Sequence, residues 1–327
     1  MLHYLSFTVP GEVTVTMWCV FFVKLLTLIT VSQAVQVLVV SNKGVNLYNT
    51  TSGHRTGLMM ENEQMMKEVD YHYGRREIFA LTKRQIIRCP LTVTSSYEYR
   101  PVVYSEDEYS FMSMTVDWVH DTLYWTAGPV FMIHKSAIDG SNHSVIFRGY
   151  YIETYHKKML VDPHARLLIW AMASQIYSTD LNGKNTKKIT FPEVLGSVRS
   201  RVKNIAVDVT RSRLYFLAGF EDDDVWLMMS GNYDGSGFRR HDPVSRFTYA
   251  IAAMGDDLYW VAKEKMETTY SPRGFKKLHT LALYRASVQA PGTSQRLLDL
   301  NTGAVWNMKI CDPEFQRSSG NVSSQST

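Results

Sequence analysis

A pair of aromatic or apolar residues recurs along this 327-residue chain at nearly constant intervals, and this period limits the folds open to it. The pairs are Phe79-Ala80, Tyr124-Trp125, Ile169-Trp170, Tyr215-Phe216 and Tyr259-Trp260. Their first members lie 45, 45, 46 and 44 residues apart. Such regular self-similarity indicates a repeat architecture, in which each unit buries its apolar surface against its neighbours.

The unit at 114–147 shows the content of one repeat. A short apolar run ends at Asp117, a second run covers 123–126, and a third, alternating run covers 131–138. Asp139-Gly140, a dipeptide typical of tight hairpins, separates the third run from the last. Four short strands without strong helical periodicity predict a propeller blade rather than a pair of helices.

Residues around the recurring pair repeat as well. Asp117, Asp162 and Asp208 each lie seven residues before the first member of a pair. The hairpin dipeptide recurs as Asp139-Gly140, Asn182-Gly183 and Asp234-Gly235. A catalytic site at the centre of a ring would need different residues from each blade. We therefore assign these equivalent Asp residues a structural role.

The two ends of the chain supply the remaining blade. Residues 37–40 and 44–48 have the pattern of two strands with no first strand before them, and 308–313 resemble the first strand at 158–163. We therefore expect an all-β, six-bladed β-propeller over 35–316, closed by pairing of the C-terminal strand with the N-terminal strands. Closure removes the exposed sheet edges of an open array.

The segments outside the propeller have other expected roles. Residues 1–34 are predicted to be a signal peptide, because Lys24 precedes an apolar run that ends in small residues. The residues before Met17 include no Lys or Arg, so Met17 is an alternative start. The run is too short for a good membrane anchor, and no other stretch resembles one. We expect a secreted chain without a membrane span, and a disordered polar tail at 317–327.

Cysteine content and sequons agree with export. Asn49, Asn142 and Asn321 begin Asn-x-Ser/Thr sequons and are predicted glycosylation sites. The mature chain keeps Cys89 and Cys311, which are too few for a disulfide framework and lack the spacing of metal ligands.

The Leu-Tyr-Trp-Thr at 123–126, with Val-Asp before it and Ile-Asp-Gly-Ser-Asn after it, resembles the YWTD signature. Residues 69–73 and 306–316 resemble the first full blade and the closing segment of the same repeat. The chain is therefore identified over residues 36–316 as a divergent relative of the class B repeat of low-density lipoprotein receptors. The resemblance implies a six-bladed propeller in a receptor-type protein. It also implies a dedicated endoplasmic-reticulum chaperone as a folding partner.

The chain departs from the family in two ways. The Asp that ends the signature is replaced in all five copies, by Thr82, Ala127, Met172, Ala218 and Ala262. An EGF-like module usually follows the family's propeller, but none of its cysteines follows here. Signature residues are mainly structural in the family, which implies that role for Asp117, Tyr124, Trp125, Asp162, Trp170, Asp208, Tyr215, Tyr259 and Trp260.

The repeats differ most in the loops of one face, between second and third strands and between blades. Variable loops on a rigid scaffold are common binding sites, and acidic clusters beside aromatics suit a protein ligand. The alternative is ordinary solvated loops. The ligand-binding candidates are Glu106, Asp107, Glu108, Tyr150, Tyr151, Tyr155, Glu221, Asp222, Asp223, Asp224 and Trp226. A long insertion at 262–281 adds Lys263, Lys265, Arg273, Lys276 and Lys277.

Composition and motifs narrow the function. The net charge of +4 is small and no basic stripe is present, which gives no reason to expect nucleic acid as a partner. No nucleophile elbow, phosphate loop or metalloprotease motif occurs, so we expect no enzyme activity, cofactor or metal. The sequence favours a secreted or receptor-ectodomain propeller that binds extracellular protein ligands. The alternatives are a calcium-dependent hydrolase of the six-bladed class and a structural extracellular protein.

The blade assignment makes one prediction about the thiols. Cys89 falls on a third strand and Cys311 on an innermost strand of another blade, so we expect no bond between them. Mass spectrometry of the alkylated protein should find both thiols modified. A Cys89–Cys311 bridge would contradict the blade assignment.

Overall fold

The computed structural model describes residues 35–59, 66–91, 100–104, 110–128, 130–149, 156–191, 200–220, 225–245, 247–271, 274–290, 292–302, 304–313 and 315–316. The predicted signal peptide at 1–34 and the predicted tail at 317–327 lie outside these residues. In the part of the chain that is described, no helix has the length and hydropathy needed to cross a membrane.

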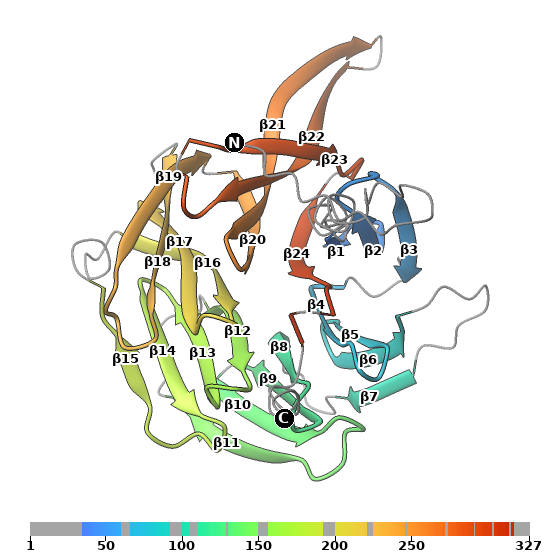
Figure 1. Ribbon diagram of the computed structural model, residues 1–327. Helices are drawn as coiled ribbons and strands as arrows, with labels where there is room; N and C mark the ends of the chain where they lie inside the picture. The colour runs from blue at the N-terminus through green and yellow to red at the C-terminus, as the bar shows by residue number, and fades with distance from the viewer. Residues whose placement is uncertain are drawn as a thin grey trace, which may run out of the picture. The chain divides into compact units, whose positions relative to one another are not determined.

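Within the described residues, twenty-four strands form six four-stranded antiparallel sheets, arranged as blades around one centre (Figure 1). Blade 1 consists of β24 (Val305–Ile310), β1 (Gln36–Ser41), β2 (Gly44–Asn49) and β3 (Arg55–Met59). Blade 2 consists of β4 (Glu68–His72), β5 (Glu77–Leu81), β6 (Gln85–Pro90) and β7 (Arg100–Tyr104). Blade 3 consists of β8 (Phe111–Asp117), β9 (Thr122–Ala127), β10 (Met132–Ala137) and β11 (Ser144–Arg148).

The second half of the ring follows the same plan. Blade 4 consists of β12 (His156–Asp162), β13 (Leu167–Met172), β14 (Gln175–Asp180) and β15 (Lys187–Ile189). Blade 5 consists of β16 (Ser200–Asp208), β17 (Arg213–Phe220), β18 (Val225–Asn232) and β19 (Arg239–Ser245). Blade 6 consists of β20 (Thr248–Met254), β21 (Asp257–Ser271), β22 (Gly274–Ser287) and β23 (Gln295–Asp299). The strand named first in each blade is the innermost, as Figure 1 shows.

The ring is closed by the two ends of the propeller sequence. Strand β24 pairs antiparallel with β1, so that Ile310 lies opposite Val37 and Met308 lies opposite Val39. Each innermost strand also contacts the innermost strands of both neighbouring blades. The predicted six-bladed, all-β fold and its mode of closure are therefore confirmed.

The two thiols lie where the repeat placed them. Cys89 is on β6, the third strand of blade 2, and Cys311 directly follows β24. Both are buried in the apolar cluster between blades 1 and 2, and they are not bonded to each other. Burial raises the pKa of each thiol from 9.0 to about 12, which keeps both protonated at neutral pH.

The apolar core is divided among the blade interfaces. Among the described residues, six clusters form, one between each pair of neighbouring blades. Tyr124 and Trp125 are adjacent on β9, so their side chains point to opposite faces of blade 3. Trp125 packs with Phe79 of blade 2, whereas Tyr124 packs with Met159 and Trp170 of blade 4. The recurring pair therefore contributes to two interfaces at once.

The hairpin glycines also fix the distance between blades. Gly140, Gly183 and Gly235 have φ angles of +90°, +76° and +88°, a region that favours glycine. Each lies against the outermost part of the preceding blade. A Cβ atom would stand 2.1 Å from the Val102 carbonyl oxygen, 2.0 Å from that of Ile146 and 2.3 Å from that of Thr190, respectively. Side chains at these positions would force neighbouring blades apart.

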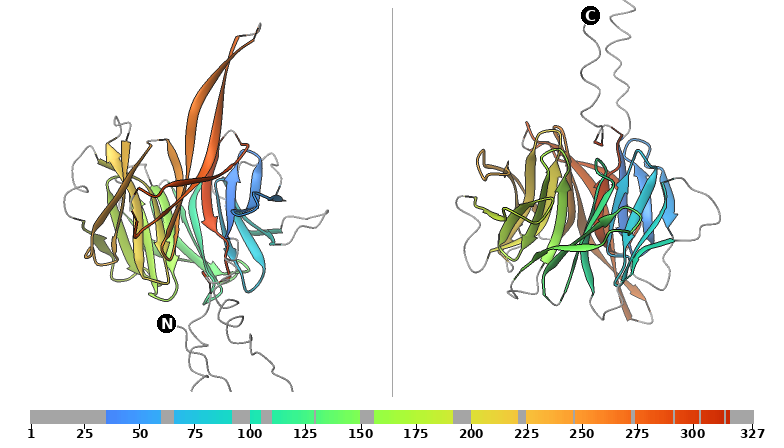
Figure 2. Two further views of the ribbon diagram at one scale, coloured as in Figure 1. Left: turned by 45° about the horizontal axis from the view of Figure 1, so that its top comes forward. Right: turned by 90° about the horizontal axis from the view of Figure 1, so that it is seen from below.

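Blade 6 contains the largest difference from expectation. The predicted loop insertion at 262–281 is not irregular, because β21 and β22 continue through it as paired strands of 15 and 14 residues. The paired backbone projects beyond the ring as a two-stranded arm (Figure 2). Thr and aromatic residues, which favour extended backbone, are frequent in this segment and explain the regular pairing.

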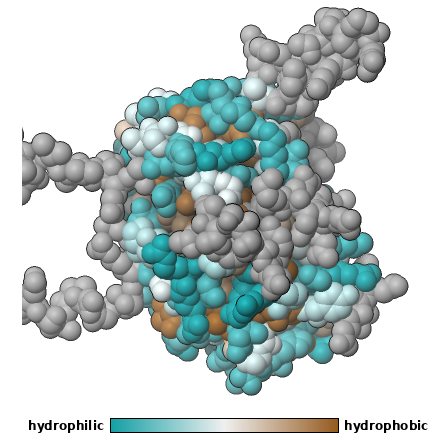
Figure 3. All heavy atoms as spheres, turned by 90° about the vertical axis from the view of Figure 1, so that its right-hand side faces the viewer, coloured by the Kyte–Doolittle hydropathy of each residue, from teal (hydrophilic) through white to brown (hydrophobic). Residues whose placement is uncertain are grey.

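One side of the ring shows how polar and apolar residues are distributed on its surface. On the side that carries β3 and β7, hydrophilic residues predominate among the coloured atoms, with hydrophobic ones between them (Figure 3). Large apolar side chains with substantial exposure include Tyr104, Val119, Val130 and Phe247.

A matched pair of glycine substitutions tests the role of the hairpin contacts. Gly183→Ala places a Cβ atom against the Ile146 carbonyl, whereas Gly53→Ala has positive φ (+69°) but nothing within 4 Å of the added atom. We expect Gly53→Ala to lower the free energy of unfolding by about 1 kcal/mol and Gly183→Ala by roughly 3 kcal/mol. Denaturant unfolding measures both. Equal losses would mean that backbone conformation alone, and not contact between blades, requires these glycines.

Candidate functional site

The innermost strands enclose a central channel lined by unlike residues at equivalent positions of the repeat. One layer contains Glu68, Ser113, Lys158, Asn204 and Asn307, and the next contains Asp70, Thr115, Leu160, Ala206, Ala252 and Lys309. The channel therefore holds two carboxylates and two amines at its centre. The sequence shows that the residues at these positions differ between repeats. Only closure of the ring shows that their side chains line one channel.

Glu68 joins three blades. The residue is 4% exposed, and its carboxylate accepts hydrogen bonds from the Ser113 hydroxyl at 2.6 Å and the Met114 amide at 2.8 Å. The side-chain amide of Asn307 donates to it at 3.0 Å from blade 1. Burial raises the pKa of Glu68, while Lys158 and Lys309 oppose that shift through their charges.

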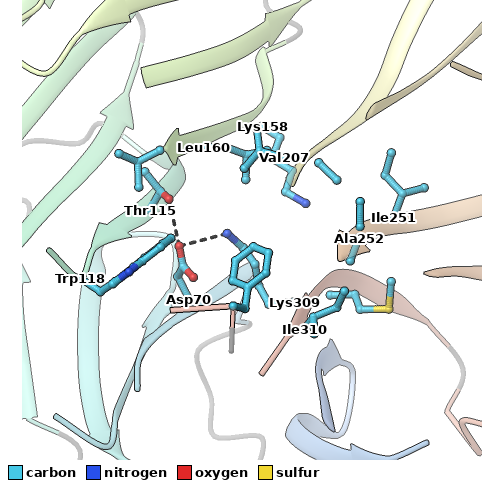
Figure 4. Close-up of a pocket in the computed structure, with 15 residues that line it drawn as sticks. Asp70, Thr115, Trp118, Lys158, Leu160, Val207, Ile251, Ala252, Lys309 and Ile310 are labelled. Carbon is cyan, nitrogen blue, oxygen red and sulfur yellow. Dashed lines mark hydrogen bonds and ion pairs between the residues drawn. The ribbon is translucent and has the colours of Figure 1, made fainter. Parts of the chain in front are cut away.

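Asp70 lies one layer away and is paired directly (Figure 4). It accepts hydrogen bonds from the Thr115 hydroxyl at 2.9 Å and the Val116 amide at 3.0 Å. The Lys309 ammonium lies 3.0 Å from the same carboxylate oxygen. This ion pair joins blades 1 and 2 at the point where the ring closes.

Lys158 is the second buried amine. It is 3% exposed and donates to the side-chain oxygen of Asn204 at 3.3 Å. Figure 4 shows Lys158 and Lys309 coming from different strands and pointing into the same opening. Burial, followed by repulsion from Lys309, lowers the pKa of Lys158 from 10.5 to about 8.

The open volume in the channel is small. The cavity beside Asp70 and Lys158 measures about 40 Å³. Trp118 and Phe315 both line it, and their ring centres lie 6.0 Å apart. A cavity of this volume accommodates water but not an organic substrate. Within the described residues, no three His, Cys, Asp or Glu side chains gather as candidate metal ligands.

The equivalent Asp residues cap turns. Asp117 accepts hydrogen bonds from the amides of Val119 and His120, each at 3.0 Å. Asp162 accepts from the amides of His164 and Ala165 at 3.0 and 2.9 Å, and Asp208 accepts from the amide and hydroxyl of Thr210 at 3.0 and 2.6 Å. Each carboxylate holds the turn between the first and second strands of its blade. These contacts are structural ones.

A larger opening than the channel cavity lies between blades 3 and 4. It is a pocket of about 550 Å³ lined by Phe131, Phe147, Arg148, Trp170, Met172 and Tyr177, among others. Its walls include the turn between β13 and β14 and the segment just before β10, which are connections between second and third strands. The pocket thus opens on the face where the repeats vary. Its volume lies in the range of small-molecule sites.

Sequence inspection missed this pocket. Trp170 was assigned only a structural role, although it is also a wall of the pocket. Phe131, Phe147 and Tyr177 had the pattern of ordinary apolar strand residues. A usable signal was the pairing of Trp170 with Tyr177 across a short hairpin, since both then lie on one face of blade 4.

Most predicted ligand-binding residues lie outside the described part of the chain. These are Glu106, Asp107, Glu108, Tyr150, Tyr151, Tyr155, Glu221, Asp222, Asp223 and Asp224. Trp226 is described and is only 6% exposed, because it packs in the core between blades 5 and 6. The Lys203 ammonium lies 5.4 Å from the centre of its indole ring. In this packing, Trp226 offers little surface to a ligand.

The predicted glycosylation sites have different settings. Asn142 lies in the exposed turn between β10 and β11. Asn49 ends β2, and its side-chain oxygen accepts hydrogen bonds from the amides of Thr51 and Ser52 at 3.0 and 2.8 Å. Asn321 lies outside the described residues.

Known structures share the fold at low sequence identity. The chain matches no protein-family profile. A chain of a nidogen–laminin complex is similar, with a TM-score of 0.64 and 11% identity over 84% of this chain and 98% of that one. TolB from Acinetobacter baumannii matches with a TM-score of 0.61 and 11% identity, over 85% of this chain and 66% of that one. An oligogalacturonate lyase in complex with manganese matches with a TM-score of 0.55 and 10% identity, over 79% of this chain and 71% of that one.

The buried amine in the channel predicts a dependence of stability on pH. Between about pH 8 and 10.5 the unfolded chain retains a Lys158 proton that the folded chain has released, so this group makes stability rise with pH. Cys89 and Cys311 act in the opposite direction above pH 9, because their folded pKa values are raised.

Comparison with Lys158→Met isolates the lysine. Between about pH 8 and 10.5, we expect the free energy of unfolding of the native chain to rise by about 1–3 kcal/mol relative to that of the variant. Denaturant unfolding at several pH values measures the difference. Lys184→Met removes an exposed lysine and is the matched control. Parallel curves for the native chain and Lys158→Met would contradict the assignment.

Proposed function

We propose that this chain is a secreted or receptor-type propeller that binds an extracellular protein ligand and has no catalytic activity. The observation that carries the proposal is the contrast between the channel cavity and the pocket between blades 3 and 4. The described cavity in the channel measures about 40 Å³ and Asp70 beside it is paired with Lys309, whereas a pocket of about 550 Å³ opens on the variable face. Binding through variable loops on a rigid ring is a common use of such scaffolds.

We infer further that the chain is a divergent relative of the YWTD propellers of lipoprotein receptors. Support comes from the spaced Tyr-Trp pairs and the turn-capping Asp residues. The structural similarity to a chain from a nidogen–laminin complex agrees with an extracellular binding role. A signal peptide at 1–34, glycans at Asn49, Asn142 and Asn321, and a propeller-specific chaperone remain part of this proposal.

A metal-dependent enzyme is the second candidate, because one structurally similar protein is a lyase in complex with manganese. The chemistry of the channel disfavours it. Divalent cations prefer several carboxylate or carbonyl oxygens, but here Lys309 lies 3.0 Å from Asp70 and Lys158 lies buried beside Glu68. A cation would have to displace both ammonium groups or bind against their electrostatic repulsion. A purely structural protein is the third candidate and needs no ligand pocket.

A capture experiment distinguishes these functions. The purified chain, immobilised, is incubated with extracellular fluid, and retained proteins are identified and then tested for saturable binding. We expect one saturable protein partner, and reduced capture by a variant with Ala at 221–224 if that loop contributes.

Parallel measurements address the alternatives. Calorimetric titration with calcium and manganese is expected to show no stoichiometric ion. Tight binding of one ion, together with hydrolase or lyase activity, would favour the enzyme and contradict the binding proposal. The absence of any saturable partner would favour the structural protein.

A further inference from the structure

The pocket between blades 3 and 4 combines an apolar interior with an electropositive rim. Resting on the proposed function, we propose that it receives a large apolar side chain, such as Phe, from an acidic peptide segment of the protein ligand. Two features of the described residues carry this inference: an aromatic wall, and positive charge that no described carboxylate pairs.

The wall is built from aromatic rings of both blades. Trp170 stacks on Phe131 with ring centres 5.8 Å apart and on Tyr177 at 5.7 Å. Phe147 lies 5.5 Å from Trp170 in a tilted orientation. Met172, half-buried, extends the same lining. Aromatic rings favour further aromatic or large aliphatic groups, with geometry that defines their orientation.

Trp170 also carries a hydrogen-bond donor without an acceptor. The side chain is 1% exposed, and its indole N–H has no partner. Buried indole N–H groups normally find an acceptor, since leaving one unpaired costs about 1–3 kcal/mol. This nitrogen has almost no accessible surface, so a ligand in the pocket reaches it only when Trp170 or its neighbours move, and the donor does not define the ligand.

The rim is positively charged. Arg148 is exposed and lines the pocket, and its described contact is a hydrogen bond to the sulfur of Met132 at 3.4 Å. No described carboxylate pairs with it. Lys188 lies opposite Tyr177 in the β14–β15 pairing, so it shares the face of blade 4 that borders the pocket. Among the described residues that line the pocket, none is acidic, and charge complementarity therefore favours acidic residues beside the anchor.

A buried apolar anchor surrounded by charged rim contacts is the usual arrangement of a protein-binding hot spot. A neutral sugar would leave the charge of Arg148 unpaired and would bring no large apolar group to the aromatic wall. A small aromatic acid carries a single negative charge, whereas two cations, Arg148 and Lys188, border the pocket. An acidic peptide segment with one large apolar residue supplies both the apolar group and several negative charges.

Fluorescence polarisation with labelled synthetic peptides tests the inference on the full secreted chain. The probe is Gly-Glu-Asp-Phe-Glu-Asp-Gly; one control peptide has Ala in place of Phe, and another has Lys in place of the acidic residues. We expect the probe to bind roughly tenfold more tightly than either control. We also expect its affinity to fall as salt is added, because exposed charges are screened.

Protein variants locate the site. Thr186 is an exposed residue of the pocket lining, so Thr186→Trp should fill the opening and abolish binding. Arg148→Glu reverses the charge of the rim and should weaken binding by roughly tenfold or more. Arg240→Glu, at an exposed position on β19 of blade 5, is the matched control and should leave binding unchanged.

The outcomes separate this inference from the proposed function. Equal binding of all three peptides, or full binding by Thr186→Trp, would overturn the pocket assignment. If the native chain and Thr186→Trp capture a partner equally, the pocket assignment is also overturned, but the proposed binding function is not. If free phenylpropionate displaces the probe with equal affinity, the ligand of the pocket is a small aromatic acid and the proposed peptide ligand is wrong. Failure to capture any partner overturns the proposed function itself.

Discussion

Packing between neighbouring blades is the interaction on which this structure depends. A four-stranded sheet with apolar residues on both faces cannot cover either face alone, so each blade needs two neighbours. The alternation of β-strands places Tyr124 toward one neighbour and Trp125 toward the other. Repetition of this pair in blades 2 to 6 contributes to the six clusters found among the described residues, in place of one central core. Pairing of β1 with β24 then leaves no interface uncovered at the ends.

Polar contacts set the geometry of this apolar framework. Outside, the hairpin glycines let the blades approach to a distance that no side chain would allow. At the centre, Glu68 and Asp70 accept hydrogen bonds from blades on both sides, and Lys309 neutralises Asp70. Buried charges are stable only when they are paired and hydrogen-bonded, so this network fixes the relative positions of the innermost strands. The centre therefore contributes to the scaffold, and the proposed binding function uses the variable face.

The candidate pocket arises where two blades with different outer residues meet. Phe131 and Phe147 come from blade 3, and Trp170 and Tyr177 come from blade 4. Within its own repeat, Trp170 belongs to the recurring pair, and the other three have the pattern of ordinary strand residues. On the variable face, beside Arg148, these four residues line one pocket that neither blade forms alone. The same framework can thus carry different sites at different interfaces without any change in its core.

The sequence alone determined the number of blades, their strand order, the closing pair and the turns, because period, alternation and hairpin dipeptides are local features. It also placed Cys89 and Cys311 on separate blades. Tertiary structure decided the rest. Glu68 and Lys158 are 90 residues apart, and only closure of the ring brings their charges into one channel. Burial of Trp226 and assembly of the aromatic pocket likewise depend on which blade faces which, and no local pattern in the chain records those distances.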